Sequence, residues 1–328
     1  MTSIKLSFLI LFTCGILSRN SLGLSPVILI PGDGGSQLEA KLNKTNVVHY
    51  ICAKTSPDYF NIWLNLELLV PFVIDCWVDN LKLEYDNVTR TTKGPSGVDI
   101  RIPGWGNPEP VEWLDPSHQN ENGKFFADLK TMVENTYNAN NKSSVTLLVH
   151  SMGGLMAMHF LRLQPQAWKD QYIRRLISLS TPWGGSMKAV KVFAIGDDLG
   201  SLMLRESIMR AQQITCPSLA WLLPSPLFWK PTEVLVQTDK YNYTINDFQR
   251  LFTLVYKPGT WLDGYPTLAM GDGDGTVNLR SLNACEHWRK KRFRNGNSVK
   301  SLALPGAEHL KILHDKRVLD YIQLVMKN

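Results

Sequence analysis

The stretch SVTLLVHSMGGLMAMHFLRL, residues 143–162, decides the fold class. Its first half, Val145 to Val149, is a mostly apolar run typical of a buried strand, and its second half repeats apolar residues at helical spacing. Between the halves stands Ser151, with Gly153 two residues on. A strand that turns sharply into a helix exposes one side chain at the end of a sheet, and the close approach requires small neighbours. The stretch therefore predicts a serine nucleophile at such a turn, although Val149 is larger than the usual Gly or Ala and is expected to crowd it.

Two further segments are predicted strands of the same sheet. Val27 to Ile30 is a short apolar run that ends in a Pro/Gly turn, and RRLISLSTPWGG, residues 174–185, is a strand that ends in a loop at Thr181. A strand, a helix and a strand in succession imply parallel pairing, because parallel neighbours need a crossover connection. The chain is thus predicted to be an α/β protein with a mostly parallel sheet.

A serine hydroxyl is a poor nucleophile without a base, so an α/β-hydrolase requires an acid and then a His farther along the chain. Three histidines follow the candidate acids, and His309 is favoured because SVKSLALPGAEH, residues 298–309, reads as a strand and a turn. His314 lies one turn into the next helical segment, and His287 adjoins a charged run.

The acid is expected in the Gly-spaced loop AMGDGDGTVN, residues 269–278, which contains Asp272 and Asp274. The alternative of a calcium loop lacks the later Glu of an EF-hand, and Asp274 is the predicted orienting acid. Acyl transfer also needs donors for the developing oxyanion. The backbone N–H of Met152 supplies one by position, and the loop PGDGG places Asp33 where the second is expected.

The N-terminus predicts entry into the secretory pathway. Residues 1–23 combine Lys5, an apolar run from Leu6 to Leu17 and small residues before a cleavage point, and an anchor would need about 20 apolar residues. Residues 24–328 then form the mature hydrolase domain. In an oxidising compartment Cys52 and Cys76 are expected to pair, which stabilises the fold by about 3 kcal/mol. Whether Cys216 and Cys285 pair stays open, and four sequons predict glycosylation at Asn43, Asn87, Asn141 and Asn242.

Two segments are predicted insertions: residues 50–97, and residues 191–232, which are rich in Met and Pro and resemble a lid or cap more than sheet. In the first, apolar side chains crowd between the two cysteines and predict either a core helix or an outward, membrane-adsorbing surface. The residues predicted for the membrane-binding surface are Trp63, Leu64, Leu66, Leu68 and Leu69.

Composition and charge restrict the classes of function. With 328 residues, 44% of them hydrophobic, the chain can bury a sizeable core. The net charge of +6 is modest, and the basic run Arg289 to Arg294 is either a solvated face or an attraction to an anionic membrane. We expect lipid substrates and a phospholipid surface as partners, with no nucleic acid, protein partner, metal or cofactor.

Seven motifs resemble the lecithin:cholesterol acyltransferase family, and within it the lysosomal phospholipase A2 branch (1-O-acylceramide synthase). They are PGDGGSQLEAKL, VVHYICAK, IWLNLELLVPFVIDCWVDN, VHSMGG, QPQAWKDQYIRRLISLSTPWGG, GDGDGTVNL and LPGAEH. The resemblance implies an α/β-hydrolase core with Ser151, Asp274 and His309 as triad, Asp33 and Met152 as oxyanion donors, a Cys52–Cys76 disulfide, and the two insertions as membrane-binding segment and lid. It also implies an acyl-enzyme formed from a glycerophospholipid, with the acyl group passed to water or a short-chain ceramide, in the lysosome lumen or after secretion.

The sequence departs from this family in two places. A stretch with a helix and a sheet strand is missing where Gln119 runs into Asn120, and another is replaced by WLDGYPTLAM, residues 261–270, so Cys285 is expected to lack its family partner. The sheet is therefore expected to be incomplete. The alternative function is that of a catalytically inactive, membrane-adsorbing or non-functional truncated member.

Overall fold

The computed structural model describes residues 24–106, 122–198, 205–255, 267–292 and 299–327. Several sequence predictions fall wholly or partly outside these ranges: the signal peptide at 1–23, the junction at Gln119, residues 199–204 of the lid, the first part of WLDGYPTLAM, the end of the basic run and the first residue of the stretch 298–309. None of the helices in the described ranges has the length and apolar character needed to cross a bilayer.

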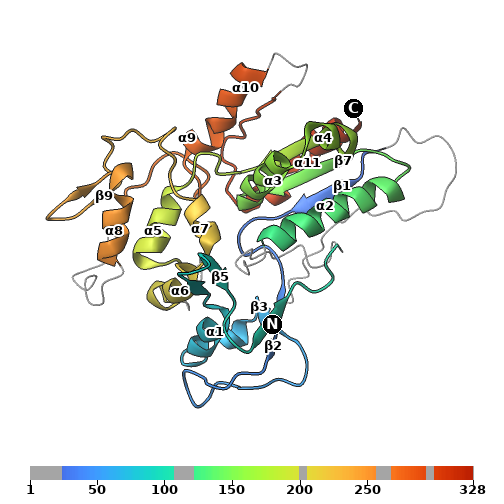
Figure 1. Cartoon of the computed structure of the whole chain (residues 1–328). Helices are drawn as coiled ribbons and strands as arrows, with labels where there is room; N and C mark the ends of the chain where they lie inside the picture. Colours follow the sequence, from blue (N-terminus) through green and yellow to red (C-terminus); the bar gives the residue numbers. More distant parts are fainter. Residues whose placement is uncertain (1–23, 107–121, 199–204, 256–266, 293–298, 328) are drawn as a thin grey trace, which may run out of the picture.

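The central sheet is parallel and contains β1 (Val27–Ile30), β7 (Val145–His150) and β8 (Ile173–Leu179), in the order β1-β7-β8. The bounds of β1 agree with the sequence prediction, and the predicted β7 is one residue longer in the structure. Within the described ranges β8 pairs with β7 alone. The predicted α/β class is therefore confirmed, with helices packed against a short parallel sheet (Figure 1).

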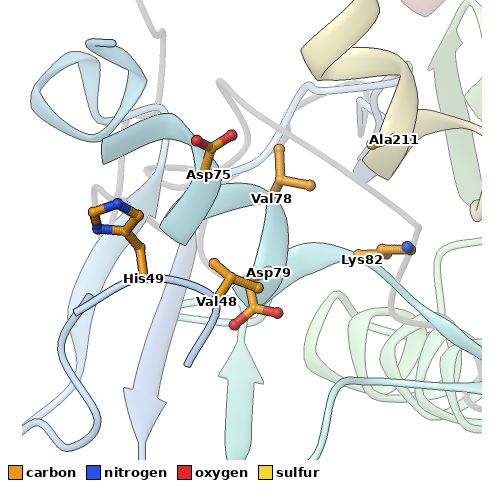
Figure 2. Close-up of a pocket in the computed structure, with 7 residues that line it drawn as sticks. All are labelled: Val48, His49, Asp75, Val78, Asp79, Lys82 and Ala211. Carbon is orange, nitrogen blue, oxygen red and sulfur yellow. The ribbon is translucent and has the colours of Figure 1, made fainter. Parts of the chain in front are cut away.

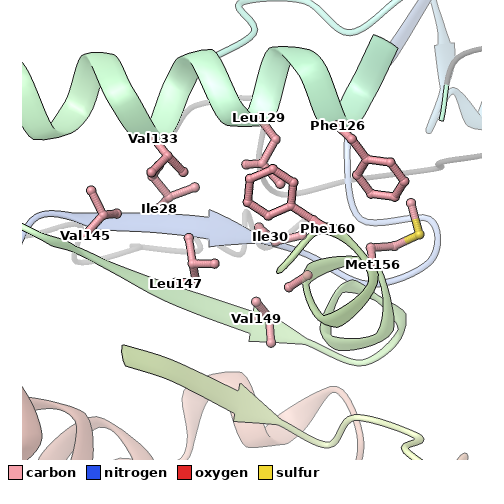
Figure 3. Packing of buried hydrophobic residues seen from close by; sticks show 11 residues of the cluster. Ile28, Ile30, Phe126, Leu129, Val133, Val145, Leu147, Val149, Met156 and Phe160 are labelled. Carbon is pink, nitrogen blue, oxygen red and sulfur yellow. The ribbon is translucent and has the colours of Figure 1, made fainter. Parts of the chain in front are cut away.

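Helices α2 (Asn122–Ala139) and α3 (Met152–Leu163) pack against this sheet, with α4 (Gln166–Tyr172) next along the chain. Figure 3 shows side chains of α2 reaching down to β1 and β7, with Met156 and Phe160 of α3 closing the same cluster. Val149 is 1% exposed within this core, so its bulk is accommodated there. Each fully buried apolar side chain of this size stabilises the fold by about 1.5–3 kcal/mol.

The first insertion and the segments on either side of it fold around a second core. An antiparallel sheet of order β3-β2-β6 joins β2 (Leu38–Leu42), β3 (Phe60–Trp63) and β6 (Val98–Arg101), and α1 (Val73–Leu81) packs near it. The shorter elements are the 3-10 helix η1 (Leu66–Leu69) and the hairpin of β4 (Glu84–Asp86) and β5 (Thr91–Lys93). Sequence periodicity did not predict this sheet.

The structure divides the five residues predicted for the membrane surface. Trp63 and Leu69 are buried, and the Trp63 indole N–H donates to the carbonyl of Gly34 over 2.9 Å. Leu64 and Leu68 are half-buried against the same core, whereas Leu66 is 69% exposed. Trp63 and Leu69 therefore face the protein interior, contrary to the outward surface predicted for them, because α1 and the small sheet enclose them.

The described part of the second insertion consists of helices joined by turns and irregular segments. It includes most of α5 (Met187–Ile195), then α6 (Glu206–Gln213) and α7 (Pro217–Trp221). Lys191 of α5 forms ion pairs with Asp197, over 3.2 Å, and with Glu206 of α6. Next along the chain come β9 (Val236–Gln237), β10 (Asn242–Tyr243), η3 (Ile245–Asp247) and α8 (Phe248–Val255).

The C-terminal part contains α9 (Leu279–Leu282), η4 (Asn283–Cys285), α10 (Glu286–Arg292), η6 (Lys311–His314) and α11 (Lys316–Lys327). The strand predicted before His309 is not formed, since residues 299–304 have no regular secondary structure. A strand requires a hydrogen-bonded neighbour, and this segment pairs with none of the described strands.

Candidate active site

Ser151 lies at the sharp turn from β7 into α3. Its backbone has φ 52° and ψ −129°, a region that non-glycine residues rarely adopt and that costs about 1–3 kcal/mol. Small neighbours make the turn possible: a Cβ at Gly153 would lie 2.2 Å from the carbonyl oxygen of Pro31, and one at Gly154 2.1 Å from the hydroxyl of Thr181. The strand, the turn and the small residues thus present the Ser151 hydroxyl as the sequence predicted.

His309 joins Ser151 to Asp274. The Nε2 atom of His309 lies 2.8 Å from the Ser151 hydroxyl oxygen, and Nδ1 lies 2.7 Å from a carboxylate oxygen of Asp274. His309 is 7% exposed and Asp274 8%. In the neutral tautomer with the proton on Nδ1, the ring donates to the carboxylate and accepts from the serine hydroxyl. The three side chains therefore form one hydrogen-bonded chain.

Asp274 is held by its own loop. Its second carboxylate oxygen accepts backbone N–H groups of Thr276, over 3.0 Å, and Val277, over 2.8 Å. Burial by itself raises the pKa of the carboxyl, but the hydrogen bond and charge of His309 and these two backbone donors lower it more, so the pKa lies below its usual value. Asp274 is therefore ionised at neutral pH.

The acid and base loops are also joined through their backbones. The N–H of His309 donates to the carbonyl of Asp274 over 2.8 Å, and Gly273 bridges Asn278 across the acid loop. Neither Asp274 nor His309 lies in or directly after a described strand. Loops thus hold both side chains, as predicted for Asp274, whereas a strand was predicted before His309.

The competing candidates lie elsewhere. Asp272, His287 and His314 are all exposed, in contrast to the enclosed Asp274 and His309. A general base and its orienting acid must lie within hydrogen-bond distance of each other and of the nucleophile. That geometry selects Asp274 and His309 among the candidates.

The two segments expected to supply oxyanion donors lie next to the nucleophile. Met152 is the first residue of α3, where backbone N–H groups have no partner within the helix, and it is 1% exposed. The loop that contains Asp33 approaches closely as well, because a Cβ on the preceding Gly32 would lie 2.7 Å from the Ser151 Cβ. Gly32 allows the loop to approach Ser151 this closely, and the sequence did not predict this role. The only signal for it was its place in a Gly-rich turn.

His150 is the second residue that sequence reasoning missed. It is 8% exposed, its Nε2 atom lies 2.9 Å from the carbonyl oxygen of His309, and the two ring centres are 4.9 Å apart. Burial, followed by the charge of His309, lowers the pKa of His150 to about 4. A single His at the end of a strand gives no pattern in sequence that would mark it.

A hollow of about 300 Å³ lies away from these residues, in the first insertion and next to α6 (Figure 2). Figure 2 shows side chains of α1 at this hollow; it is lined by Val48, His49, Asp75, Val78, Asp79, Lys82 and Ala211. The described ranges contain no group of three or more His, Cys, Asp or Glu residues arranged to hold a metal ion.

The predicted disulfide is present, since Cys52 and Cys76 are bonded with a Cα–Cα distance of 5.4 Å. Cys216 and Cys285 form no disulfide. Instead, the Cys216 sulfur lies 3.2 Å from the side-chain amide nitrogen of Gln212, and Cys285 lies 3.6 Å from the carbonyl of Leu282. The asparagines of the four sequons, Asn43, Asn87, Asn141 and Asn242, are all exposed.

Comparison with known proteins identifies similar sequences. A family model described as "Lecithin:cholesterol acyltransferase" matches residues 59–121 and 117–263. "Lysosomal phospholipase A and acyltransferase" of Homo sapiens is 37% identical over 380 residues, covering 92% of this chain and 90% of that protein. The Bos taurus protein of the same name is 37% identical over 375 residues, covering 92% and 91%. "Phosphatidylcholine-sterol acyltransferase" of Gallus gallus is 33% identical over 368 residues, covering 90% and 88%.

The human alignment is longer than this chain, at 380 positions against 328 residues. The human protein therefore carries stretches that this chain lacks. In the structure the shortened chain nevertheless brings Ser151, Asp274 and His309 within hydrogen-bond distance.

Proposed function

Because the chain belongs to the lecithin:cholesterol acyltransferase family, we propose that it is a serine-dependent lipid acyl hydrolase and transacylase. Its relatives are named for phospholipase A and acyltransferase activities, and the family resemblance expected from the sequence is confirmed. The observation that carries the proposal is the hydrogen-bonded chain from Asp274 through His309 to Ser151.

In the first step His309 accepts the Ser151 proton at Nε2 while the serine oxygen attacks the carbonyl carbon of a fatty acyl ester. Asp274 stabilises the imidazolium that forms, without taking its proton. The tetrahedral intermediate collapses when the bond from the carbonyl carbon to the glycerol oxygen breaks, and His309 returns the proton to that oxygen. The products are an acyl-Ser151 ester and a lysophospholipid.

In the second step an acceptor hydroxyl takes the place of the glycerol oxygen. His309 removes the proton from water or from the hydroxyl of a lipid alcohol such as N-acetylsphingosine, and the acceptor oxygen attacks the acyl carbon. The bond from that carbon to the Ser151 oxygen then breaks, and His309 returns the proton to Ser151. The backbone N–H groups of Met152 and Asp33 stabilise the oxyanion in both steps, and loss of one such donor typically costs about 2.7–4 kcal/mol. The product is a free fatty acid or an acylated lipid alcohol.

The insertions and surface features support a lipid enzyme in the lysosome lumen or outside the cell. Leu66 and Phe72 are 69% and 72% exposed beside η1 and supply apolar contact for a phospholipid surface. The residues 191–232 are proposed as a cap over the substrate. A disulfide and four exposed sequon asparagines fit a glycosylated protein that has passed through an oxidising compartment.

The test is fatty acid release from phosphatidylcholine vesicles that contain N-acetylsphingosine, at acidic and neutral pH. We expect release and acylceramide formation that Ser151→Ala abolishes, because a triad nucleophile contributes about 10⁶ in rate. Ser281→Ala is the matched control for removal of a buried serine away from the triad. Release that persists in Ser151→Ala would show that a different residue attacks.

The second candidate is an inactive, membrane-adsorbing member of the family, and the shortened sheet favours it. A fluorophosphonate probe separates the two functions, since only an activated serine reacts with it. Labelling that requires Ser151 supports the enzyme, whereas a folded protein with an intact disulfide that resists labelling supports the second candidate.

A further inference from the structure

One buried titratable side chain next to the nucleophile takes no part in the mechanism above. His150 ends β7, directly before Ser151, and is 8% exposed. Its Nε2 atom lies 2.9 Å from the backbone carbonyl oxygen of His309. A carbonyl only accepts hydrogen bonds, so Nε2 carries a proton and donates it. The same residue that orients the proton of Ser151 is thus held at its backbone by His150.

The surroundings keep the His150 ring uncharged. Burial, and then the charge of His309, lower its pKa to about 4, although its hydrogen bond to the His309 carbonyl and the charge of Asp274 act in the opposite direction. Asp33 follows Gly32 in the loop that approaches the ring, where a Cβ on Gly32 would lie 3.2 Å from His150 Nδ1. His309 and Asp274 are therefore the titratable groups that act on the ring, and Asp33 is the titratable residue of the adjoining loop.

We propose that His150 is a positioning residue that fixes the backbone of His309 and, as a neutral ring, allows His309 to carry a positive charge during acyl transfer. The inference rests on the proposed function. His309 must become an imidazolium in both steps, and the two ring centres are 4.9 Å apart. A second positive charge at that distance would oppose the protonation on which general-base catalysis depends.

The test uses the full chain with a soluble short-chain ester, and three variants. His150→Gln keeps a donor near the position of Nε2 but cannot be charged, and His150→Leu removes the donor. His287→Gln is the matched control, because His287 is exposed and outside the site. For His150→Leu we expect kcat at pH 7 to fall about tenfold, the size of one lost buried hydrogen bond, with KM unchanged. His150→Gln should restore most of the loss.

The pH profile provides a readout that a merely structural role would not change. As pH falls through about 4 the wild-type protein takes up a proton at His150, so log kcat should fall more steeply there than it does in His150→Gln. His150→Gln cannot take up this proton, and His287→Gln should follow the wild type. Equal slopes in the wild type and His150→Gln, or wild-type kcat in His150→Leu, would overturn the inference.

The fluorophosphonate probe distinguishes failure of the proposed function from failure of the role proposed for His150. If the wild type is not labelled at Ser151, the proposed function is rejected and this inference with it. If the wild type is labelled and hydrolyses the ester, but His150→Leu does so equally well, only the role of His150 is rejected.

Discussion

Asp274 shows how single residues set the chemistry of the site. Its carboxylate accepts hydrogen bonds from His309 and from two backbone N–H groups of its own loop, so it stays ionised while the imidazole changes charge. A neutral amide in its place would keep the shape of the side chain and lose the charge. The function of Asp274 is therefore separable from its packing.

Asp274→Asn should lower kcat for a soluble ester by about 10⁴, because the His309 tautomer that accepts the serine proton is no longer favoured. The measurement is kcat and KM at pH 7, with correct folding checked by circular dichroism. Asp272→Asn, two residues away and exposed, should keep wild-type kcat. A similar fall in both variants would contradict the assignment of the acid.

His150 predicts how stability depends on pH. Its pKa is about 4 in the folded protein and about 6.5 in the unfolded chain, so between these values the unfolded chain binds more protons. The free energy of unfolding should therefore decrease as pH falls from 6.5 to 4, by about 3 kcal/mol in total from this residue. The lowered pKa of Asp274 removes further stability as pH falls below the usual pKa of an Asp.

Urea denaturation at pH 7, 5.5 and 4.5 measures this dependence. The free energy of unfolding should fall more for the wild type than for His150→Gln between pH 7 and pH 4.5. A difference between the two proteins that is the same at every pH does not affect this comparison. Parallel pH profiles for the two proteins would show that His150 does not change its charge on unfolding in this range.

At the scale of residues, the sequence predicted the three members of the hydrogen-bonded chain. The turns around them are local patterns, and the order Ser, Asp, His can be read directly along the chain. It did not predict His150, whose role depends on contact with a residue far along the chain. Hydrogen-bond partners of this kind follow from packing and leave no trace in periodicity.

At the scale of elements, the segment from η1 to α1 separates core from surface within a few residues. Trp63 and Leu69 are buried, while Leu66 and Phe72 are 69% and 72% exposed. Sequence analysis described the whole segment as apolar and left core and membrane surface as alternatives. The structure contains both, because Leu69 packs into the core of the small sheet and α1 whereas Leu66 lies outside it.

The double variant Leu66→Ser, Phe72→Ser should weaken adsorption to phosphatidylcholine vesicles at least tenfold, since each apolar side chain that enters lipid contributes about 1.5–3 kcal/mol. Hydrolysis of a soluble ester should be unchanged. Adsorption is measured by vesicle sedimentation, and undiminished adsorption would place the membrane contact elsewhere.

Trp63→Ala is the contrasting variant. It should lower the free energy of unfolding by about 3 kcal/mol, as expected for removal of a buried aromatic side chain that also donates a hydrogen bond. Trp63→Ala with unchanged stability but weaker adsorption would mean that the side chain leaves the core at a membrane.

The strands of the parallel sheet were predicted well. The bounds of β1 agree with the sequence, and β7 and β8 lie where apolar runs placed them. The strand predicted before His309 is absent because apolar periodicity records only the character of side chains. Whether such a run becomes a strand depends on a neighbouring edge, and single-sequence patterns do not contain that information.

At the scale of the whole molecule, charge and apolar surface act together. The chain carries a formal net charge of +6, and screening shortens the range of such charge from about 10 Å at 0.1 M salt to about 3 Å at 1 M. Adsorption to vesicles with anionic lipid should therefore weaken several-fold between these salt concentrations.

Adsorption to zwitterionic vesicles is the control, and it should stay constant or strengthen as the salt concentration rises. The rate of hydrolysis of a soluble ester should likewise not fall. The measurement is vesicle sedimentation at each salt concentration. Adsorption to anionic vesicles that does not change with salt would show that the apolar residues alone bind the membrane.

The backbone bond between His309 and Asp274 has a consequence for how activity is lost. Both side chains belong to loops outside the described strands, and each loop is anchored partly by the other. When one loop opens, the second loses a tether, so the acid and the base leave the serine in a single cooperative event. Amide hydrogen exchange should accordingly be equally fast at residues 274 and 309 and much slower in β7, and heating should inactivate the protein before its sheet melts.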